Sequence, residues 1–317
     1  TPRIYIRYKN ARDKKLANKI SVDDSDFSIC LDTIEHEYSI SEIDTVIRLH
    51  HLKFDGNKNP MTKALADTLY TYIIDYCISS RNRQEPLTPK QSAILTKEAR
   101  SLFRHPKISD DSPDKTGEAG ETLLYFLLES VLKAPQLVSK MELKTNHRDE
   151  VKGSDGIHAK WNNDLGLVDF YFGESKLYKD ISSAITSALK SINDFHDVDM
   201  SAHEFSMVTK HFKYADDVVK KEISDLFING NPGPNVRINH ACLIGFDYDG
   251  YAKIINEPSN VFAKKFKETY LADSEEFINS LNKKLHKFEK KHLALDFFII
   301  PFPSVSEFRN AFNEALD

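Results

Sequence analysis

Three short motifs hold the side chains of this sequence that could act together in catalysis. Asp155 lies in the run Ser-Asp-Gly-Ile-His, Glu174 and Lys176 lie in Gly-Glu-Ser-Lys, and Glu118 and Glu121 lie in Gly-Glu-Ala-Gly-Glu. Carboxylates are ligands that small, hard divalent cations prefer, and a nearby lysine can orient an attacking water. Gathered at one point, such side chains could hydrolyse a phosphodiester with the help of a bound metal ion.

The Glu-x-Lys spacing of Glu174 and Lys176 carries weight only because of its position. Asp/Glu-x-Lys also occurs where chance would produce it in a charged chain, at Asp13–Lys15, Glu142–Lys144, Glu150–Lys152 and Glu289–Lys291. Glu174, in contrast, follows residues 167–172, a largely apolar and aromatic run that predicts a core strand. A charged pair there is costly to bury unless it is ion-paired or bound to a metal. Strand alternation predicts Glu174 and Lys176 on one face and Ser175 on the other.

Asp155 lies at the start of a predicted hairpin. Residues 156–161 and 166–177 are predicted strands around an Asn-Asn-Asp turn, and a hairpin returns the chain beside itself. Gly153 and Gly156 flank Asp155 and remove bulk where a backbone or a phosphate would approach. The alternative is that Asp155 is an acidic turn residue without a catalytic role.

The acidic residues of the third motif begin a predicted helix over residues 116–133. Glu118, Glu121 and Tyr125 share one face of that helix at the spacing i, i+3, i+7. Acids in a first turn commonly only complement the helix dipole, and this alternative applies to either glutamate. A lone histidine on a strand, such as His158, is more often structural than catalytic. The support for a site therefore comes from the order of the motifs, not from any single residue.

The composition is typical of a globular protein with a sizeable core. No window of the 317 residues approaches the apolar length needed to span a bilayer, and the N-terminus has no apolar signal-peptide core. Cys30, Cys77 and Cys242 are widely spaced, which predicts buried, reduced thiols and no cysteine zinc site. We therefore expect a cytoplasmic protein that does not enter a membrane.

The net charge of −5 is unfavourable for a protein that binds nucleic acid by itself. The first nineteen residues are basic, which indicates a solvated strand and turn or, as the alternative, a surface for DNA or an acidic partner. The sequence has no Gly-x-x-x-x-Gly-Lys phosphate loop and no Gly-x-Ser-x-Gly elbow. Nucleoside triphosphate hydrolysis and serine-ester chemistry therefore have no support.

The elements predicted from periodicity fall into two regions, separated by a polar linker over residues 106–114. Region 1–110 is α+β and largely helical, with a strand at 4–8, a short element within 26–38, and helices over 61–78 and 88–103. Region 115–317 has helices over 116–133, 180–195, 259–291 and 304–316, and strands over 137–143, 156–161, 166–177, 238–246 and 293–302. This pattern predicts an α/β fold in which a sheet is flanked by helices.

Region 115–317 resembles the PD-(D/E)xK nuclease superfamily in the order of its motifs: an acidic helix, an aspartate at a strand start, Glu-x-Lys on the hairpin partner, then a helix. More narrowly, the three motifs and the closing Asp-Phe-Phe-Ile-Ile-Pro-Phe-Pro run are similar to the HamA family. HamA proteins are nuclease subunits of Hachiman-type anti-phage defence, with AbpA-like relatives. The resemblance implies a restriction-endonuclease-like mixed sheet. The helix after Lys176 lacks the Gln-x-x-x-Tyr of RecB-like members, which disfavours that subfamily.

The resemblance also implies the ligands of a Mg²⁺ or Mn²⁺ ion. Asp155 and Glu174 would bind the ion directly, and the carbonyl of Ser175 would be a further ligand. Glu121 would act through a water molecule, while Glu118 stays open as the alternative helix carboxylate. Small hard cations keep several waters, which suits this mixed set of oxygen ligands.

Lys176 would orient or deprotonate the attacking water, so the implied catalytic set is Glu121, Asp155, Glu174 and Lys176. The implied function is a metal-dependent DNA nuclease of bacterial anti-phage defence. Its implied partner is a superfamily 2 helicase, HamB-like, which holds the nuclease inactive until DNA activates the complex. Region 1–110 and residues 259–291 are the expected docking surfaces. The alternative is a non-catalytic interaction subunit that keeps a nuclease-like fold.

Overall fold

The computed structural model of the protein describes residues 15–83, 85–103, 117–144, 153–198, 200–229 and 231–317. The predicted strand at residues 4–8 and the predicted linker at 106–114 lie outside these residues. Of the basic N-terminal residues, Lys15 pairs with Glu222 and Lys19 with Asp216, at 2.8 and 3.0 Å. These two lysines therefore contribute to contacts within the fold.

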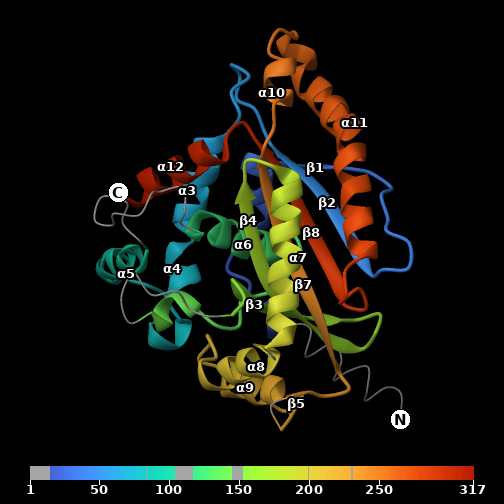
Figure 1. Ribbon diagram of the computed structural model, residues 1–317. Helices are drawn as coiled ribbons and strands as arrows, with labels where there is room; N and C mark the ends of the chain where they lie inside the picture. The colour runs from blue at the N-terminus through green and yellow to red at the C-terminus, as the bar shows by residue number, and fades with distance from the viewer. Residues whose placement is uncertain (1–14, 84, 104–116, 145–152, 199, 230) are drawn as a thin grey trace.

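In the described part of the chain, six strands form one mixed sheet in the order β1-β2-β8-β7-β4-β3 (Figure 1). They are β1 (Leu31–Ile34), β2 (Thr45–Leu52), β3 (Gly156–Asn162), β4 (Leu167–Tyr178), β7 (Val236–Asp247) and β8 (Ala294–Phe302). The four central strands are parallel to one another, and β1 and β3 pair antiparallel at the edges. The short strands β5 (Phe227–Ile228) and β6 (Asn231–Pro232) form a separate pair.

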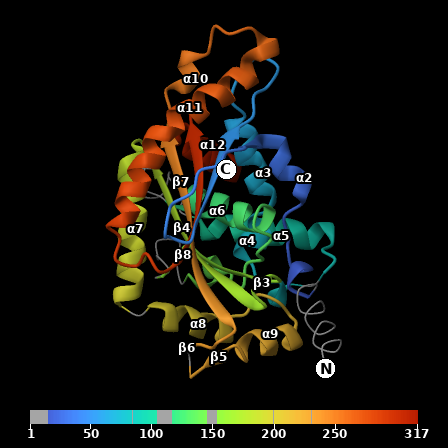
Figure 2. The ribbon, with the colours of Figure 1, turned by 90° about the vertical axis from the view of Figure 1, so that its right-hand side faces the viewer.

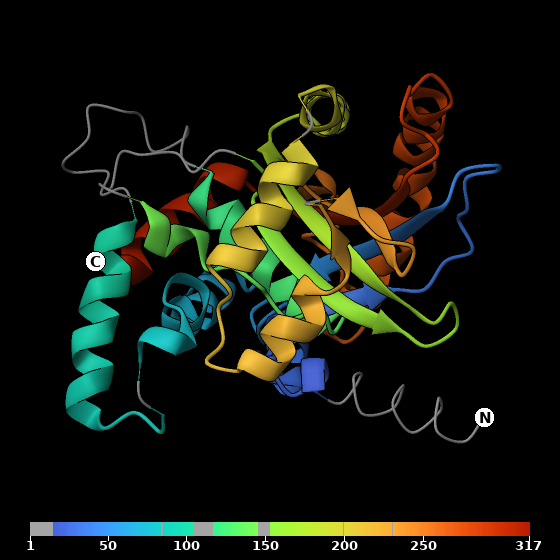
Figure 3. The ribbon, with the colours of Figure 1, turned by 90° about the horizontal axis from the view of Figure 1, so that it is seen from below.

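Helices cover both faces of the sheet, as Figure 2 shows with the sheet seen nearly edge-on. One face is covered by α7 (Ile181–Asp197) and α11 (Ser259–His286), and the other by α6 (Glu118–Ser130), α3 (Thr62–Thr71) and α12 (Val305–Leu316). Seen from below, α8 (Met200–Lys210) and α9 (Asp217–Ser224) lie on the viewer's side of the sheet (Figure 3). β8 is buried along its whole length because helices lie on both sides of it. The fold is thus the predicted mixed α/β sheet flanked by helices.

Further helices of the described ranges lie mainly in the first third of the chain. They include α2 (Asp24–Cys30), α4 (Ile73–Cys77), η1 (Ser80–Asn82), α5 (Pro89–Leu102), η3 (Lys140–Leu143) and α10 (Gly250–Lys253). The predicted start of α5 is confirmed, since Thr88 accepts a hydrogen bond from the Gln91 amide and the Gln91 side chain accepts one from the Thr88 amide.

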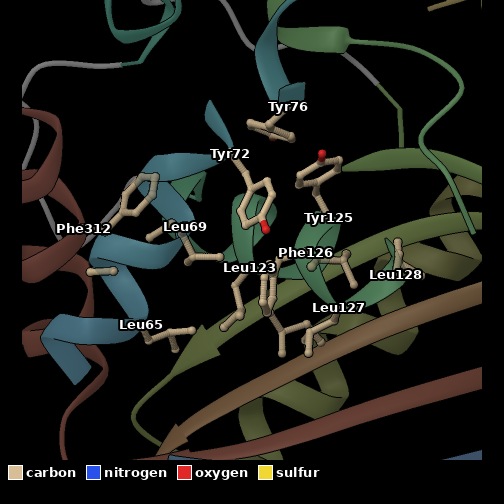
Figure 4. Packing of buried hydrophobic residues seen from close by; sticks show 14 of the residues in the cluster. Leu65, Leu69, Tyr72, Tyr76, Leu123, Tyr125, Phe126, Leu127, Leu128 and Phe312 are labelled. Atoms are coloured by element: carbon tan, nitrogen blue, oxygen red, sulfur yellow. The ribbon is translucent and has the colours of Figure 1, made fainter. Parts of the chain in front are cut away.

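A buried cluster of aromatic and aliphatic side chains fixes α6 against its neighbours (Figure 4). Leu123 and Phe126 of α6 belong to this cluster with Leu69 of α3 and Phe312 of α12, and each is at most 1% exposed. Burying side chains of this size stabilises the packed helices by about 1.5–3 kcal/mol each. The first turn of α6, which carries the acidic motif, is therefore held at a fixed place over the sheet.

Two predicted elements differ from the structure. The strand predicted over residues 137–143 is wrong: Gln136 forms an isolated bridge with His158, and Lys140–Leu143 form the helical turn η3. Residues 137–141 are all buried, so their burial does not alternate as on a half-exposed strand. The helix predicted over 61–78 is divided at Tyr72 into α3 and α4, because the backbone of Tyr72 leaves the helical region.

The sequence did not predict β2, α8 or α9. β2 pairs in parallel with β8, so the predicted region 1–110 contributes β1 and β2 to the same sheet as region 115–317.

The three cysteines are free, and their predicted burial is confirmed. Among the helices of the described ranges, none combines the length and the apolar character needed to cross a bilayer.

Candidate active site

Strand β4 presents Glu174 and Lys176 on one face of the sheet, in the second half of the strand. The Lys176 Nζ lies 2.5 Å from the Glu174 Oε1, and the two side chains are 20% and 14% exposed. Residues 167–172 of the same strand supply the buried first half, with Phe170 and Phe172 fully buried. The apolar run therefore brings a charged pair to the margin of the core, as the alternation predicted.

Asp155 lies directly before β3 and contacts the middle of the Glu-x-Lys motif. Its amide donates to the carbonyl of Gly173 at 2.8 Å, and its Oδ2 accepts a hydrogen bond from the Ser175 amide at 2.6 Å. The ladder between β3 and β4 ends at the pair Gly156 and Gly173, so the backbone of Ser175 has no strand partner on this edge. Since the N–H and C=O of one strand residue point to the same side, the Ser175 carbonyl faces this edge too.

Helix α6 brings the third carboxylate from the opposite face of the sheet. A Cβ at Gly120 would lie 2.9 Å from the Ser175 Oγ and 3.1 Å from the Leu177 Cγ. A Cβ at Gly117 would lie 2.7 Å from the Glu121 Oε1. The two glycines of the acidic motif therefore let α6 approach β4 closely and leave room for the Glu121 carboxylate beside it.

The structure separates the roles of the two glutamates on α6. Glu118 pairs with Lys144 at 2.9 Å, with side chains 10% and 7% exposed. Glu121 accepts a hydrogen bond from the Tyr76 hydroxyl at 3.4 Å, and among the neighbouring charges that of Asp155 raises its pKa most. Glu118 is thus engaged in a buried ion pair, whereas Glu121 interacts electrostatically with the Asp155 side of the site.

The proton affinity of all three carboxylates is raised. Burial, followed by the charge of Asp155, raises the pKa of Glu121 to about 8 and that of Glu174 to about 7. Burial also raises the pKa of Asp155, although the Ser175 amide opposes that shift. Burial disfavours the charged form of Lys176, but Glu174 outweighs it and raises the pKa of the lysine, which stays protonated at neutral pH. Glu121 and Glu174 therefore favour their protonated forms near neutral pH, and a bound cation would favour their ionised forms.

Comparison with known proteins identifies the family. A family model named HamA matches residues 28–316, nearly the whole chain. The chain belongs to the HamA family. This membership makes it a component of Hachiman-type anti-phage defence, and it extends the resemblance from region 115–317 to most of region 1–110. No curated protein matches the chain.

The donor set of this HamA protein fits a small, hard cation in part. Asp155, Glu174 and the Ser175 carbonyl offer oxygen ligands at one edge of β4. Within the described ranges, however, no three Asp, Glu, His or Cys side chains lie close enough together to bind one ion.

His158 is a structural residue in this fold. It is fully buried, its Nδ1 donates to the Ala134 carbonyl at 2.8 Å, and burial lowers its pKa to about 3. The neutral ring also lies beside Tyr125, away from solvent.

Sequence reasoning missed the residues that support the site, namely Tyr76, Lys140, Lys144 and Glu204. Lys144 is the lysine of Glu142–Lys144, one of the chance occurrences of Asp/Glu-x-Lys. Its position there does not indicate that it contacts Glu118.

Proposed function

We propose that the protein is a metal-dependent DNA nuclease within Hachiman-type defence. One observation carries the proposal: the Asp155 carboxylate is hydrogen-bonded at 2.6 Å to the amide of Ser175, between Glu174 and Lys176 of the Glu-x-Lys motif. Glu121 approaches from α6, on the other face of the sheet. Oxygen ligands from two strands, a charged lysine and a further acid are the groups that metal-assisted phosphodiester hydrolysis requires.

Each residue has a distinct role in this proposal. Asp155 and Glu174 would hold Mg²⁺ or Mn²⁺ together with the Ser175 carbonyl, and the ion would stabilise the charge that develops on the phosphate. Lys176 carries its proton at neutral pH, so it donates to the attacking water or to a phosphate oxygen and orients it. Glu121 accepts from a water molecule once it has lost its own proton.

The proposed partner is a superfamily 2 helicase, HamB-like, which restrains the nuclease and delivers DNA to it. The net charge of −5 supports a need for such delivery, because nucleic acid binding depends on positive charge. Surface charge alone would repel the substrate from much of the molecule.

The proposal is tested by degradation of a plasmid by the purified complex with ATP and Mg²⁺. We expect the double substitution Glu174→Ala/Lys176→Ala to abolish cleavage. The matched control is Glu289→Ala/Lys291→Ala, which removes the same residue types at the same spacing from an exposed position. Cleavage by the first variant at the rate of the parent and the control would end the assignment.

A second candidate, a non-catalytic interaction subunit, is favoured by the ion pair between Lys176 and Glu174, which neutralises both groups without a metal. Thermal denaturation with Mn²⁺ separates the two functions. A nuclease should gain melting temperature with Mn²⁺ and lose the gain in Asp155→Asn, because a ligand that binds only the folded state stabilises it. A scaffold should respond in neither protein.

A further inference from the structure

A buried ion pair lies beside the residue that precedes Asp155. Lys140 of η3 and Glu204 of α8 are joined at 2.6 Å between Nζ and Oε1, with side chains 8% and 0% exposed. Neither residue belongs to the predicted catalytic set, and the two come from elements 64 positions apart in the chain. Charged side chains of these types are almost never fully buried unless they are paired.

Both members of the pair bind the backbone of Ser154. The Lys140 Nζ donates to the Ser154 carbonyl at 2.7 Å, and the Glu204 Oε1 accepts from the Ser154 amide at 2.7 Å. The Ser154 hydroxyl lies 3.1 Å from the same Glu204 oxygen and donates to the Gly156 carbonyl at 3.0 Å. The residues on both sides of Asp155 are thereby tied to one buried charge pair.

The backbone at Gly153 is shaped around this pair. Gly153 has φ +109°, which side-chain-bearing residues rarely adopt, and a Cβ there would lie 2.1 Å from the Glu204 Oε1. Glycine is therefore required both by the backbone conformation and by the approach of Glu204.

Stability alone does not account for a pair of this kind. Removing two charges from water costs about as much as their attraction returns, so apolar residues of the same volume are often equally stable. The buried Glu204 Oε2 has no hydrogen-bond partner among the described residues, which adds to the cost. The pair does, however, fix the position of the Ser154 backbone, because it binds both the amide and the carbonyl of this residue.

We propose that Lys140 and Glu204 are positioning residues for Asp155. They hold Ser154 so that the next residue directs its carboxylate at the Ser175 amide and at the Glu-x-Lys motif. That the pair supports metal binding rests on the proposed function. That it maintains the hydrogen bond between Asp155 and the Ser175 amide does not. Through Glu204, the position of Asp155 depends on helix α8.

The test is the double substitution Lys140→Met/Glu204→Leu, which replaces the ion pair with apolar side chains of similar size. Hydrogen exchange resolved to single amides reports the Ser175 amide, whose recorded partner is the Asp155 carboxylate. We expect that amide to exchange about tenfold faster in the variant, because the loss of one hydrogen bond is worth about that factor. Amides at the centre of β4 should keep their protection. Mn²⁺ affinity should fall about 10- to 100-fold, as for loss of groups that support metal ligands.

The matched control is Arg48→Met/Asp296→Leu, which removes another largely buried ion pair from strands β2 and β8. It should leave the exchange of Ser175 and the Mn²⁺ affinity unchanged. If Lys140→Met/Glu204→Leu does not fold, Gly153→Ala displaces the same pair and should speed Ser175 exchange in the same way. Unchanged Ser175 exchange in a folded variant overturns the inference, whatever the metal does. Faster Ser175 exchange in the variant, together with a parent that neither binds Mn²⁺ nor cleaves DNA, supports the inference and overturns the proposed function instead.

Discussion

Replacing Asp155 with asparagine should inactivate the protein and yet stabilise its metal-free form at alkaline pH. Asparagine keeps an oxygen that can accept the Ser175 amide, so the hydrogen bond recorded at 2.6 Å persists. The substitution removes the charge that, after burial, contributes most to the raised pKa of both Glu174 and Glu121. Metal binding should be lost, because Asp155 is one of the two proposed direct ligands.

The sign of the pH effect follows from the carboxylates. Glu174 has an ordinary pKa of 4.5 and a folded pKa of about 7, so the folded state binds more protons than the unfolded state between these values. Stability therefore falls as the pH rises through this window and is lowest above it. The shift corresponds to about 3 kcal/mol at 1.36 kcal/mol per pKa unit.

Asp155→Asn should recover only part of this lost stability, because burial contributes more than Asp155 to the raised pKa of Glu174. We expect Asp155→Asn to regain on the order of 1 kcal/mol above pH 8. For a chain of 317 residues this corresponds to a rise in melting temperature of about 1.5 °C. Mn²⁺ at 100 times its dissociation constant should stabilise the parent by about 2.7 kcal/mol and the variant by almost nothing.

The assay is differential scanning calorimetry of parent and variant at pH 5.5 and 8.5, with and without Mn²⁺. The parent should lose more stability between the two pH values than the variant does. A variant that melts below the parent at pH 8.5 without metal would refute the electrostatic reasoning, since it would show that the Asp155 charge stabilises the fold.

Three further outcomes follow from the same geometry. Gly120→Ala should destabilise the fold by about 1–2 kcal/mol despite the better helix propensity of alanine, because its Cβ meets Ser175 and Leu177; an equal or higher melting temperature contradicts this. Lys144→Met should lower the free energy of unfolding by about 3–5 kcal/mol, because it leaves the charge of Glu118 buried without Lys144. In urea denaturation, Lys144→Met/Glu118→Leu should recover most of this loss. No recovery would point to another role for Lys144. The initial rate of Mg²⁺-dependent cleavage by the complex should rise between pH 6 and 8.5, as Glu174 and then Glu121 lose their protons; a flat profile would show that these carboxylates do not limit the reaction.

Local patterns predicted the elements that carry the motifs. The hairpin of β3 and β4 follows from alternation around a turn, and the uninterrupted apolar run of β8 follows from burial on both faces. The start of α5 follows from Thr88 and Gln91, whose side chains complete the cap. The turn of the hairpin and the cap of α5 are set by residues close in sequence.

Contacts between distant segments were not predictable from such patterns. Glu118 and Glu121 have the same local setting, and residues distant in sequence distinguish them: Lys144 pairs with Glu118, and Tyr76 donates to Glu121. The pairing of β2 with β8 spans most of the chain. The strand prediction at 137–143 failed because Leu137 and Val138 are buried side by side in a hydrophobic cluster and Lys140–Leu143 form a helical turn.

The most direct test of the site is calorimetric titration of the parent with Mn²⁺ at pH 7 in buffers of different ionisation enthalpy, which counts the protons released. Glu174, with a pKa of about 7, and Glu121, with a pKa of about 8, both hold protons in the metal-free protein at this pH. The account predicts saturable binding with release of about one proton per Mn²⁺ bound, and loss of both in Glu174→Ala. Binding without proton release, or equal binding by Glu174→Ala, would contradict a cation held among these carboxylates.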